Sequence, residues 1–446
     1  MNILMICNKS PFPPREGGPI AMNMIVEGLI SEGHKVKVLA VNSFKYNISP
    51  DDIPETYREK TGIELIDVDL RIKPLAAFLN LFTGRSYHVE RFISSSFRKR
   101  LTEVLQADRY DIVQMETIFV APYLSIVNAF SDAKVVLRAH NIEYLIWSRV
   151  AEGTQNPLKR RYIRHLAETL KRYEHKMIPQ FDGIAAITEQ DAEYFSGQLA
   201  VGSGQWAVGN GQWAVGRKRE ARSEKRKAKS EKRNLKPEPE RSRALRSQTR
   251  IIAIPFGIDL NSFPPPVPSP DPISLFSIGA MNWIPNAEGV RWFLHHVWPE
   301  VHKEFPSLKY YLAGREMPNW MLRISFPNVE VLGEVPDARE FIDAHGIMIV
   351  PLLSGSGIRI KIIEGMAAGK PVLSTMIGAE GIDCSNGKNI LIANAPCEFI
   401  DMISLCINDM ERCRKLSEEA RNLIETTYDR RLIIRKLISF YKQLPG

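Results

Sequence analysis

The chain has 446 residues, of which 44% are hydrophobic and 25% charged, the balance of a globular protein with two or three domains and a large core. Such a core excludes a small disulfide-scaffold protein. The formal net charge is +8, but residues 217–250 alone carry +10 and leave the rest at −2, so bulk charge does not indicate a nucleic-acid-binding class.

The first forty residues predict a βαβ unit. An apolar run, Asn2–Cys7, is followed by the loop NKSPFPPREGGP, a helical stretch from Ile20 to Ser31 and a second apolar run, Val36–Val41. Further strands are predicted at Ile112–Met115, Val135–Ala139 and Gly183–Ile187. Strands that alternate with helices in this way predict a parallel sheet.

The composition changes abruptly after Ser196. Three copies of a seven-residue unit, GQLAVGS, GQWAVGN and GQWAVGR, precede a basic repeat, ARSEKRK and AKSEKRN. These repeats are too short for a solenoid and have no coiled-coil seam, so we interpret residues 196–250 as a low-complexity basic insertion. It is either a tolerated surface insertion, which we favour, or an arm that binds RNA or a membrane.

A stiff linker is predicted at residues 262–272, which include six prolines. A second alternation of strands and helices then begins with ISLFSIG and ends in a helical stretch from Pro396 to about Tyr441. We therefore predict an α/β protein with two doubly wound, Rossmann-like domains, residues 1–261 and 273–446, and a ligand cleft between the carboxyl ends of their sheets. The last helix is expected to pack back on the first domain.

Several site classes are excluded by motif. The five cysteines are odd in number and have no CxxC spacing, which favours reduced thiols in the cytoplasm. No HxxxH or HExxH spacing occurs, so no metal site is predicted. The dinucleotide fingerprint GxGxxG and the P-loop GxxxxGK[ST] are also missing. The apolar stretches are far shorter than the ~20 residues of a membrane span.

The most informative stretch is residues 351–375, PLLSGSGIRIKIIEGMAAGKPVLST. A strand leads through a Ser/Gly turn into a helix, with Ser356 as candidate N-cap and the helix running to about Ala368. Backbone N–H groups of the turn, including that of Gly357, lie where an anion binds at a helix N-terminus. The turn and helix together therefore predict an anion site.

Two cations in the first turns of this helix strengthen the prediction. Arg359 and Lys361 oppose the helix dipole unless an anion binds beside them, and together they suit a diphosphate. Glu364 lies one to two turns further along, where it could accept hydrogen bonds from ribose hydroxyls. The alternative is a Lys361–Glu364 surface ion pair with Arg359 in solvent.

Other candidate residues follow strand ends. Gly17 and Gly18 precede a proline at a helix start and offer backbone N–H groups, although a plain tight turn fits at least as well. His140, in RAHNIEY, could bond a substrate hydroxyl or be a satisfied, partly buried histidine. Gly279 ends the first strand of the second domain, and Trp283 after it could reach a nucleotide base.

These motifs together resemble the GT-B glycosyltransferases of the large retaining family 4, the glycosyl transferases group 1. The motifs that carry the resemblance are NKSPFPPREGGP, HNIE, TEQD, IPFGID, SIGAMNWIPNAEGV, LAG, LGEVPD and SGSGIRIKIIEGMAAGKPVLSTMIGAEGI. The last is the most specific, and the similarity covers almost the whole chain except residues 196–250.

The resemblance implies transfer of a hexose from a nucleotide-diphosphate sugar to a hydroxyl acceptor with retention, without a metal or another cofactor. His140 would contact the donor sugar, Arg359 and Lys361 would stabilise the leaving diphosphate, and Glu364 would bind the ribose. Gly17, Gly18, Gly279, Trp283, Ser356 and Gly357 would complete the donor site.

The chain departs from the family pattern at two places. A glutamate that the family often has falls on Ser356, and an arginine and a lysine that often follow the strand ending at Gly279 are replaced by AMNWIPN. A subgroup with G-x-R-x-K at this place is similar. We therefore interpret the departures as subgroup variation, in which Arg359 and Lys361 neutralise the diphosphate.

The first domain would hold a sugar or lipid-linked acceptor. Its basic, partly aromatic stretch RSYHVERFISSSFRKRL, from Arg85, indicates a lipid-linked or membrane-surface acceptor, although a solvated helix face fits equally well. We expect a cytoplasmic enzyme, peripheral at the inner face of the membrane, that makes cell-surface polysaccharide or glycolipid. The alternatives are a nucleotide-sugar epimerase of the same fold and a nucleic-acid-binding protein acting through the basic insertion, although no nucleic-acid partner is expected.

Overall fold

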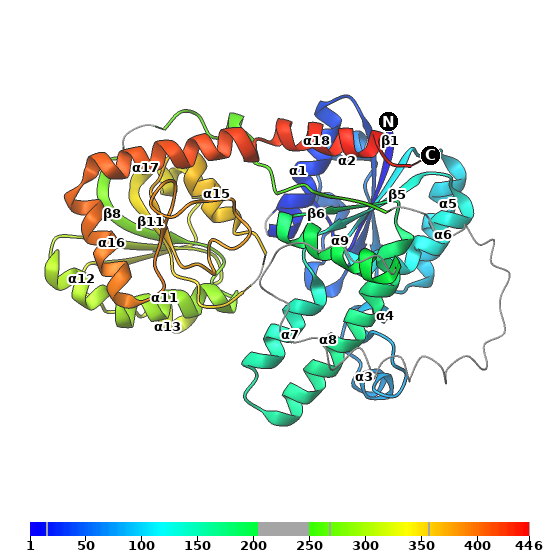
Figure 1. Cartoon of the computed structure of the whole chain (residues 1–446), viewed down its shortest axis with the longest axis horizontal. Helices are drawn as coiled ribbons and strands as arrows, with labels where there is room; N and C mark the ends of the chain where they lie inside the picture. Colours follow the sequence, from blue (N-terminus) through cyan, green and yellow to red (C-terminus); the bar gives the residue numbers. More distant parts are fainter. Residues whose placement is uncertain (15–16, 204–248, 267–268, 356, 446) are drawn as a thin grey trace.

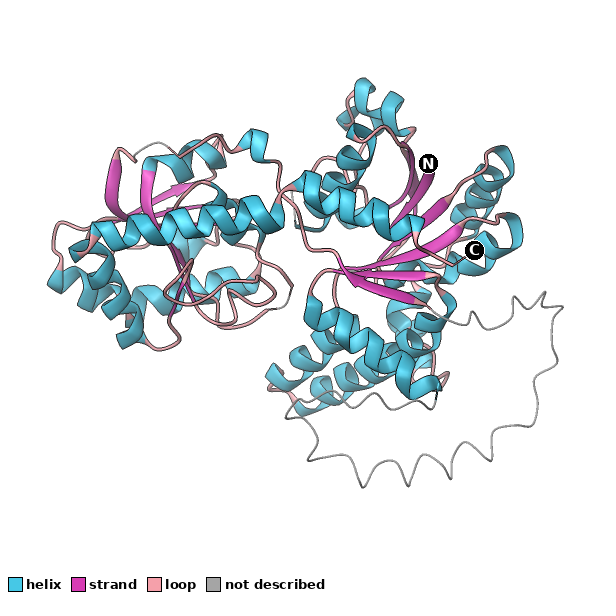
Figure 2. Ribbon diagram, turned by 45° about the horizontal axis from the view of Figure 1, so that its top comes forward, coloured by secondary structure: helices cyan, strands magenta, loops and turns pink. Residues whose placement is uncertain are grey.

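The structure is a computed structural model that describes residues 1–14, 17–203, 249–266, 269–355 and 357–445. Two α/β domains lie side by side (Figure 1), and each is built on one parallel sheet flanked by helices (Figure 2). The predicted fold class, two doubly wound Rossmann-like domains, is confirmed.

The first sheet has seven parallel strands in the order β3-β2-β1-β4-β5-β6-β7. Their bounds are β1 (Asn2–Cys7), β2 (Lys35–Asn42), β3 (Glu64–Asp67), β4 (Ile112–Glu116), β5 (Lys134–Ala139), β6 (Gly183–Ala186) and β7 (Arg250–Ala253). The sequence patterns do not predict β3, a short edge strand with no fully buried residue. The strand order reverses between β1 and β4, and ligands bind outside the carboxyl ends of strands at such a point.

Nine helices of the described residues accompany this sheet before the linker. They are α1 (Gly17–Ser31), α2 (Glu55–Thr61), α3 (Pro74–Asn80), α4 (Tyr87–Glu90), α5 (Ser95–Ala107), α6 (Leu124–Phe130), α7 (Glu143–Gly153), α8 (Pro157–Met177) and α9 (Glu189–Ser203). Helices α7 and α8 form an antiparallel pair that projects from the domain (Figure 1).

The predicted insertion, residues 196–250, is too wide at both ends. Helix α9 continues through the first repeat to Ser203, because Leu199 packs against the core and offsets the cost of about 1 kcal/mol that a helical glycine carries. At the other end, Thr249 donates a hydrogen bond of 2.9 Å to the carbonyl of Phe181, and Arg250 begins β7. The rest of the predicted insertion lies outside the described residues.

The second sheet has six parallel strands in the order β10-β9-β8-β11-β12-β13. Their bounds are β8 (Asp271–Ile278), β9 (Tyr310–Ala313), β10 (Val329–Gly333), β11 (His345–Val350), β12 (Val372–Ser374) and β13 (Leu391–Ile392). The helices are α11 (Ile284–His296), α12 (Trp298–Glu304), α13 (Asn319–Leu322), α14 (Ala338–Ala344), α15 (Ile360–Ala367), α16 (Pro396–Asn408), α17 (Met410–Leu423) and α18 (Arg430–Lys442).

The chain crosses between the domains twice, at neighbouring places. Ile258 donates a backbone hydrogen bond of 2.7 Å to Tyr428, and Arg430 donates one of 2.9 Å back to Ile258. Helix α18 then packs on α1 of the first domain (Figure 1), where Ile434 fills the space above Gly28: a Cβ at Gly28 would lie 2.4 Å from it. The second domain is therefore contained between two adjacent crossings.

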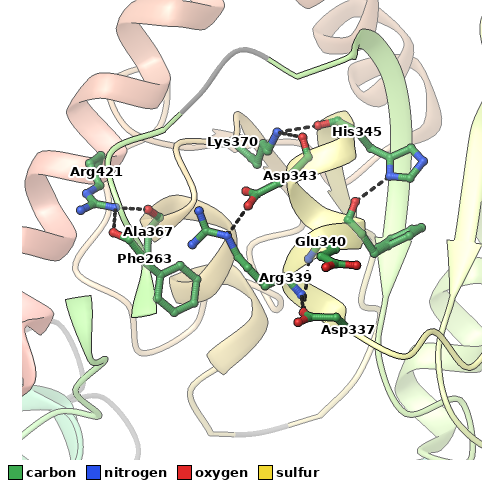
Figure 3. Close-up of polar contacts among 10 residues, drawn as sticks. Phe263, Asp337, Arg339, Glu340, Asp343, His345, Ala367, Lys370 and Arg421 are labelled. Carbon is green, nitrogen blue, oxygen red and sulfur yellow. Dashed lines mark hydrogen bonds and ion pairs between the residues drawn. The ribbon is translucent and has the colours of Figure 1, made fainter. Parts of the chain in front are cut away.

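Helix α15 is anchored at its C-terminal end (Figure 3). The Arg421 guanidinium of α17 donates to the carbonyl of Ala367 and, at 2.9 Å, to that of Phe263 in the linker. The Arg339 guanidinium lies 4.6 Å from the centre of the Phe263 ring. A cation at a helix C-terminus suits the helix dipole, so these contacts fix both the linker and the helix that carries the predicted anion site.

Candidate functional site

The predicted anion-binding helix, α15, begins three residues later than predicted. Arg359, and not Ser356, holds the N-cap position, with φ −87° and ψ 90°; Ser356 itself lies outside the described residues. Gly355 and Gly357 have φ +118° and +82°, which glycine adopts without the strain that other residues incur. The turn therefore stays non-helical until Arg359.

The Arg359 side chain is buried and not in solvent. Its guanidinium lies 5.3 Å from the centre of the Trp283 ring and donates to the carbonyl of Gly357. Burial lowers the pKa of Arg359 to about 10, although the charge of Glu380 opposes that shift, so it stays charged at neutral pH. A Cβ at Gly355 would lie 2.9 Å from this guanidinium and 3.1 Å from the Trp283 ring, so the bare backbone makes room for the stacked pair.

Lys361 reaches the carboxyl end of β8. Its ammonium lies 2.7 Å from the Asn286 side-chain oxygen and 3.4 Å from the carbonyl of Ile278. A Cβ at Gly279 would lie 3.4 Å from the same ammonium. Burial, with a smaller contribution from the charge of Arg359, lowers the pKa of Lys361 to about 7. Lys361 therefore brings a titratable cation to the strand end where the family pattern has a separate basic pair.

Glu364 lies one turn beyond Lys361 on α15. Its side chain forms no ion pair or hydrogen bond with any residue that the structure describes, and burial raises its pKa. The alternative prediction, a Lys361–Glu364 surface pair with Arg359 in solvent, is wrong, because Lys361 bonds to Asn286 and Arg359 is buried.

The N-terminus of α1 faces the start of α15 across the cleft. A Cβ at Gly17 would lie 3.6 Å from the Ile360 side chain. A Cβ at Gly18 would lie 2.9 Å from the Lys9 side chain, so Lys9 covers the same helix end. Two helix N-termini, both favourable for anions, thus meet between the domains. Lys9 is not among the residues predicted from sequence, although it lies only two residues after the strand that ends at Cys7.

His140 follows β5 and is held by a buried carboxylate. Its Nε2 lies 2.6 Å from Oε2 of Glu116, and its side chain is 12% exposed while that of Glu116 is fully buried. The Glu174 carboxylate of α8 accepts hydrogen bonds of 3.1 Å from the backbone N–H groups of both Glu143 and Tyr144. These bonds fix the start of α7 just after His140 and so position the histidine at the cleft.

A chain of buried polar groups extends from His140 to the last helix. The Tyr441 hydroxyl of α18 donates to Gln114, and Gln114 donates to Glu116, which in turn holds His140. These partners of His140 are not among the residues predicted from sequence. One signal was available: Gln114 and Glu116 are two apart in the strand IVQME, so they share one face of a buried strand, where polar groups need partners.

The domains also touch at the mouth of the cleft. Arg149 of α7 pairs with Glu380 at 3.1 Å, and Asn141 lies 3.0 Å from where a Cβ at Gly357 would stand. These four residues line one pocket between the domains. The pocket is therefore lined from both domains: Gly357, a predicted site residue, lies in it with Arg149 and Glu380, which the sequence did not indicate.

One prediction for the first domain is corrected. The aromatic side chains of the stretch from Arg85, including Tyr87, Phe92 and Phe97, are buried, as is His88. They belong to the core and are not available to a lipid. In the part of the chain that the structure covers, no helix combines the length and the apolar character that crossing a membrane requires. Within the same residues, no cluster of three or more His, Cys, Asp or Glu is placed to hold a metal.

Residues 272–409 match the family model of the glycosyl transferases group 1. The whole chain is 22% identical to a 44.6 kDa protein of the cps region of Klebsiella pneumoniae, with 98% of each chain covered. A segment of 111 residues, 24% of this chain and 31% of the other, is 28% identical to a glycosyltransferase of Methanocaldococcus jannaschii.

Two solved structures show the same fold at low identity. Sucrose-phosphate synthase from Thermosynechococcus elongatus has a TM-score of 0.63 and 14% identity, over 100% of this chain and 99% of that one. Anabaena HepE in complex with UDP has a TM-score of 0.60 and 13% identity over the whole of both chains. The comparisons support a glycosyltransferase of GT-B architecture with a group 1 domain.

Proposed function

We propose that this GT-B glycosyltransferase moves a hexose, with retention, from a nucleotide-diphosphate sugar to a hydroxyl acceptor in cell-surface polysaccharide or glycolipid synthesis. The observation that carries the proposal is the pair of cations at the start of α15, the buried Arg359 and the half-buried Lys361. Support comes from the relatives: HepE was solved with UDP and with UDP-glucose, and the Klebsiella protein comes from a cps region.

The diphosphate would lie between the two helix N-termini. On one side Arg359 supplies a planar fork and Lys361 a point charge; on the other side, Gly17 and Gly18 present the first backbone N–H groups of α1. These groups stabilise the negative charge that develops as the bond between the anomeric carbon and the diphosphate breaks. We propose that the protein's own cations take this role without a metal ion.

Retention would follow from reaction on one face of the sugar. The anomeric carbon loses its bond to the diphosphate oxygen and gains one to the acceptor oxygen, and the acceptor proton passes to the departing diphosphate. No protein nucleophile is required. His140, held by Glu116 at 2.6 Å, would bond a hydroxyl of the sugar near the reacting carbon.

A thermal-shift screen with UDP, GDP and ADP sugars tests the donor class. A donor at 100 times its dissociation constant is expected to stabilise the fold by about 2.7 kcal/mol. Product analysis with an acceptor then separates the two enzyme classes: an epimerase isomerises the nucleotide sugar without any acceptor, whereas a transferase releases nucleoside diphosphate as it forms the glycoside. A shift with none of the three donors would remove the proposal.

Glu364→Gln is expected to weaken nucleotide binding by about 1.5–3 kcal/mol, the range for a hydrogen bond to a charged group. The loss should be equal for the nucleotide sugar and for the bare nucleoside diphosphate, because both carry the ribose. Isothermal titration of the wild type and the variant measures it, with Glu300→Gln on the exposed surface of α12 as the matched control. EDTA should change neither binding nor turnover; loss of turnover in EDTA would contradict the metal-free mechanism.

Nucleoside diphosphate binding is expected to weaken as the pH rises from about 7 to about 9. The pKa of Lys361 is about 7 in the free protein, so the ammonium loses its proton in this range, whereas a bound diphosphate favours the charged form and retains it. The free energy of unfolding of the free protein should increase over the same pH range. In the unfolded chain the pKa of lysine has its ordinary value of 10.5, so between pH 7 and 9 the unfolded chain binds more protons than the folded protein.

Titration and thermal unfolding across this pH range check both trends. Lys361→Gln removes the titrating group, so the difference between wild type and variant isolates its contribution from the titration of the nucleotide itself. Identical pH trends in the two proteins would show that Lys361 does not contact the diphosphate.

A further inference from the structure

Helix α3 turns apolar side chains to solvent. Leu75, Phe78 and Leu79 of α3, and Phe82 in the turn that follows it, are each more than half exposed, and we call these four residues the outer α3 face. Their spacing of three, four and seven residues from Leu75 is that of one face of a helix, which normally packs on a core. Contiguous apolar surface of this kind marks an interaction site.

The opposite side of α3 is fixed to the protein, so the helix cannot turn its apolar side inward. The Asn80 side chain is buried and donates a hydrogen bond of 2.7 Å to Glu90. Ala77 packs into a small buried cluster with Tyr87 and Leu166 of α8. The buried side of the helix thus carries one small apolar residue and one amide, whereas its large apolar side chains face solvent.

The neighbouring first turns of α8 are strongly basic. Lys159, Arg160, Arg161 and Arg164 are all exposed, and none forms an ion pair with a residue that the structure describes. Leu158 beside them is 81% exposed. Residues 153–167 contain no aspartate or glutamate, so this end of α8 keeps its whole positive charge.

Cations also flank α3 itself, but acidic partners offset part of their charge. Arg71 and Lys73 pair with Asp69 at 2.8 and 3.4 Å, and Arg85 pairs with Glu90 at 3.6 Å. Arg71 and Lys73 share one carboxylate, so one positive charge remains beside α3. Most of the uncompensated charge of this surface therefore comes from α8, and the apolar area comes from α3.

The topology places the surface on the cleft side of the first domain. Residues 68–86 follow the carboxyl end of β3, and His140 follows the carboxyl end of β5 in the same parallel sheet. Carboxyl ends of parallel strands share one edge, so both segments leave from that edge. In Figure 1, α3 and the free end of the α7–α8 pair project from the same end of the domain.

We propose that the outer α3 face and the basic first turns of α8 bind an anionic lipid surface. The apolar side chains would enter the boundary between headgroups and acyl chains, and the cations would meet lipid phosphates. A second copy of the chain fits less well, because a two-fold contact through this surface would bring its basic turns together. The inference goes beyond the proposed function, since it needs no nucleotide or acceptor.

Co-sedimentation with vesicles of phosphatidylcholine, with and without phosphatidylglycerol, tests the proposal on the full chain. The wild type is expected to bind the anionic vesicles, and more weakly as salt rises. Phe78→Ser with Phe82→Ser should lower partitioning at least about tenfold, and joint replacement of Lys159, Arg160 and Arg161 by glutamine about 100-fold, at about fivefold a cation. Leu322→Ser, an exposed leucine of α13 in the other domain, is the control and should bind like wild type.

Three outcomes would overturn the proposal. One is a wild type that stays in the supernatant with anionic vesicles, and another is equal binding by the wild type and both variants. The third is a dimer, seen by light scattering, that the Phe78→Ser and Phe82→Ser pair dissociates; the surface would then join two copies. Because no nucleotide sugar is present in the assay, its failure leaves the proposed chemistry untouched.

Discussion

Replacing Lys361 or Arg359 by alanine is expected to lower turnover at least about 100-fold with the fold intact, the scale for removing one preorganised group that stabilises transition-state charge. Both side chains are held in place before substrate arrives, Lys361 by Asn286 at 2.7 Å and Arg359 by its stack on Trp283 at 5.3 Å. Steady-state kinetics with the donor found by thermal shift measure the loss.

The matched control is Lys303→Ala, an exposed lysine of α12 in the same domain. It removes the same charge from the domain but not from the cleft, so its turnover should equal that of wild type. Arg359→Lys should recover only part of the loss, since lysine keeps the charge but not the planar fork. Wild-type turnover in both alanine variants would contradict the assignment of Arg359 and Lys361 to the diphosphate site.

His140→Ala is expected to lower kcat about 10²-fold, because it removes a group positioned at the reacting sugar. Glu116→Gln should give a smaller loss. Glu116 is a positioning residue: its carboxylate only accepts, and so keeps the proton on His140 Nε2, whereas a glutamine can donate to that nitrogen and reverse the ring's proton arrangement.

The two variants are separated by their kinetics. Glu116→Gln should lower kcat and change its pH dependence while the dissociation constant of the bare nucleoside diphosphate stays the same, a pattern that a general loss of stability would not produce. A Glu116→Gln enzyme with an unchanged pH profile would show that the carboxylate only supports the fold. An unchanged kcat in His140→Ala would show that the histidine is a hydrogen-bonded, partly buried residue that does not contact the sugar.

Most of the strands and helices of the fold can be predicted from local patterns of apolar and turn residues in the sequence. Apolar runs bounded by turns identify the central strands, such as β1 and β5, because both faces of those strands are buried. The edge strand β3 escaped detection because none of its residues is fully buried. Sequence alone places the start of α15 too early, because it shows the serine as an N-cap candidate but not the positive φ of Gly355 and Gly357, which keeps the turn non-helical.

The candidate site was predictable only where its residues are neighbours in sequence. Arg359, Lys361 and Glu364 lie within one helix, so spacing reveals them. The polar groups linked to His140 do not lie within one helix. Tyr441 and Gln114 are 327 residues apart, and only the return of α18 to the first domain brings them together. The ion pair between Arg149 and Glu380 likewise depends on how the two domains meet.

The two adjacent crossings at Ile258 and Asp429 have a mechanical consequence. The second domain is inserted within the sequence of the first, so tension applied through Asn2 of β1 and Tyr441 of α18 acts on the first domain alone. The second domain bears no load until α18 has been pulled from its seat on α1. Under force, α18 should therefore detach from the first domain before the second domain, which carries the predicted diphosphate site, bears any load.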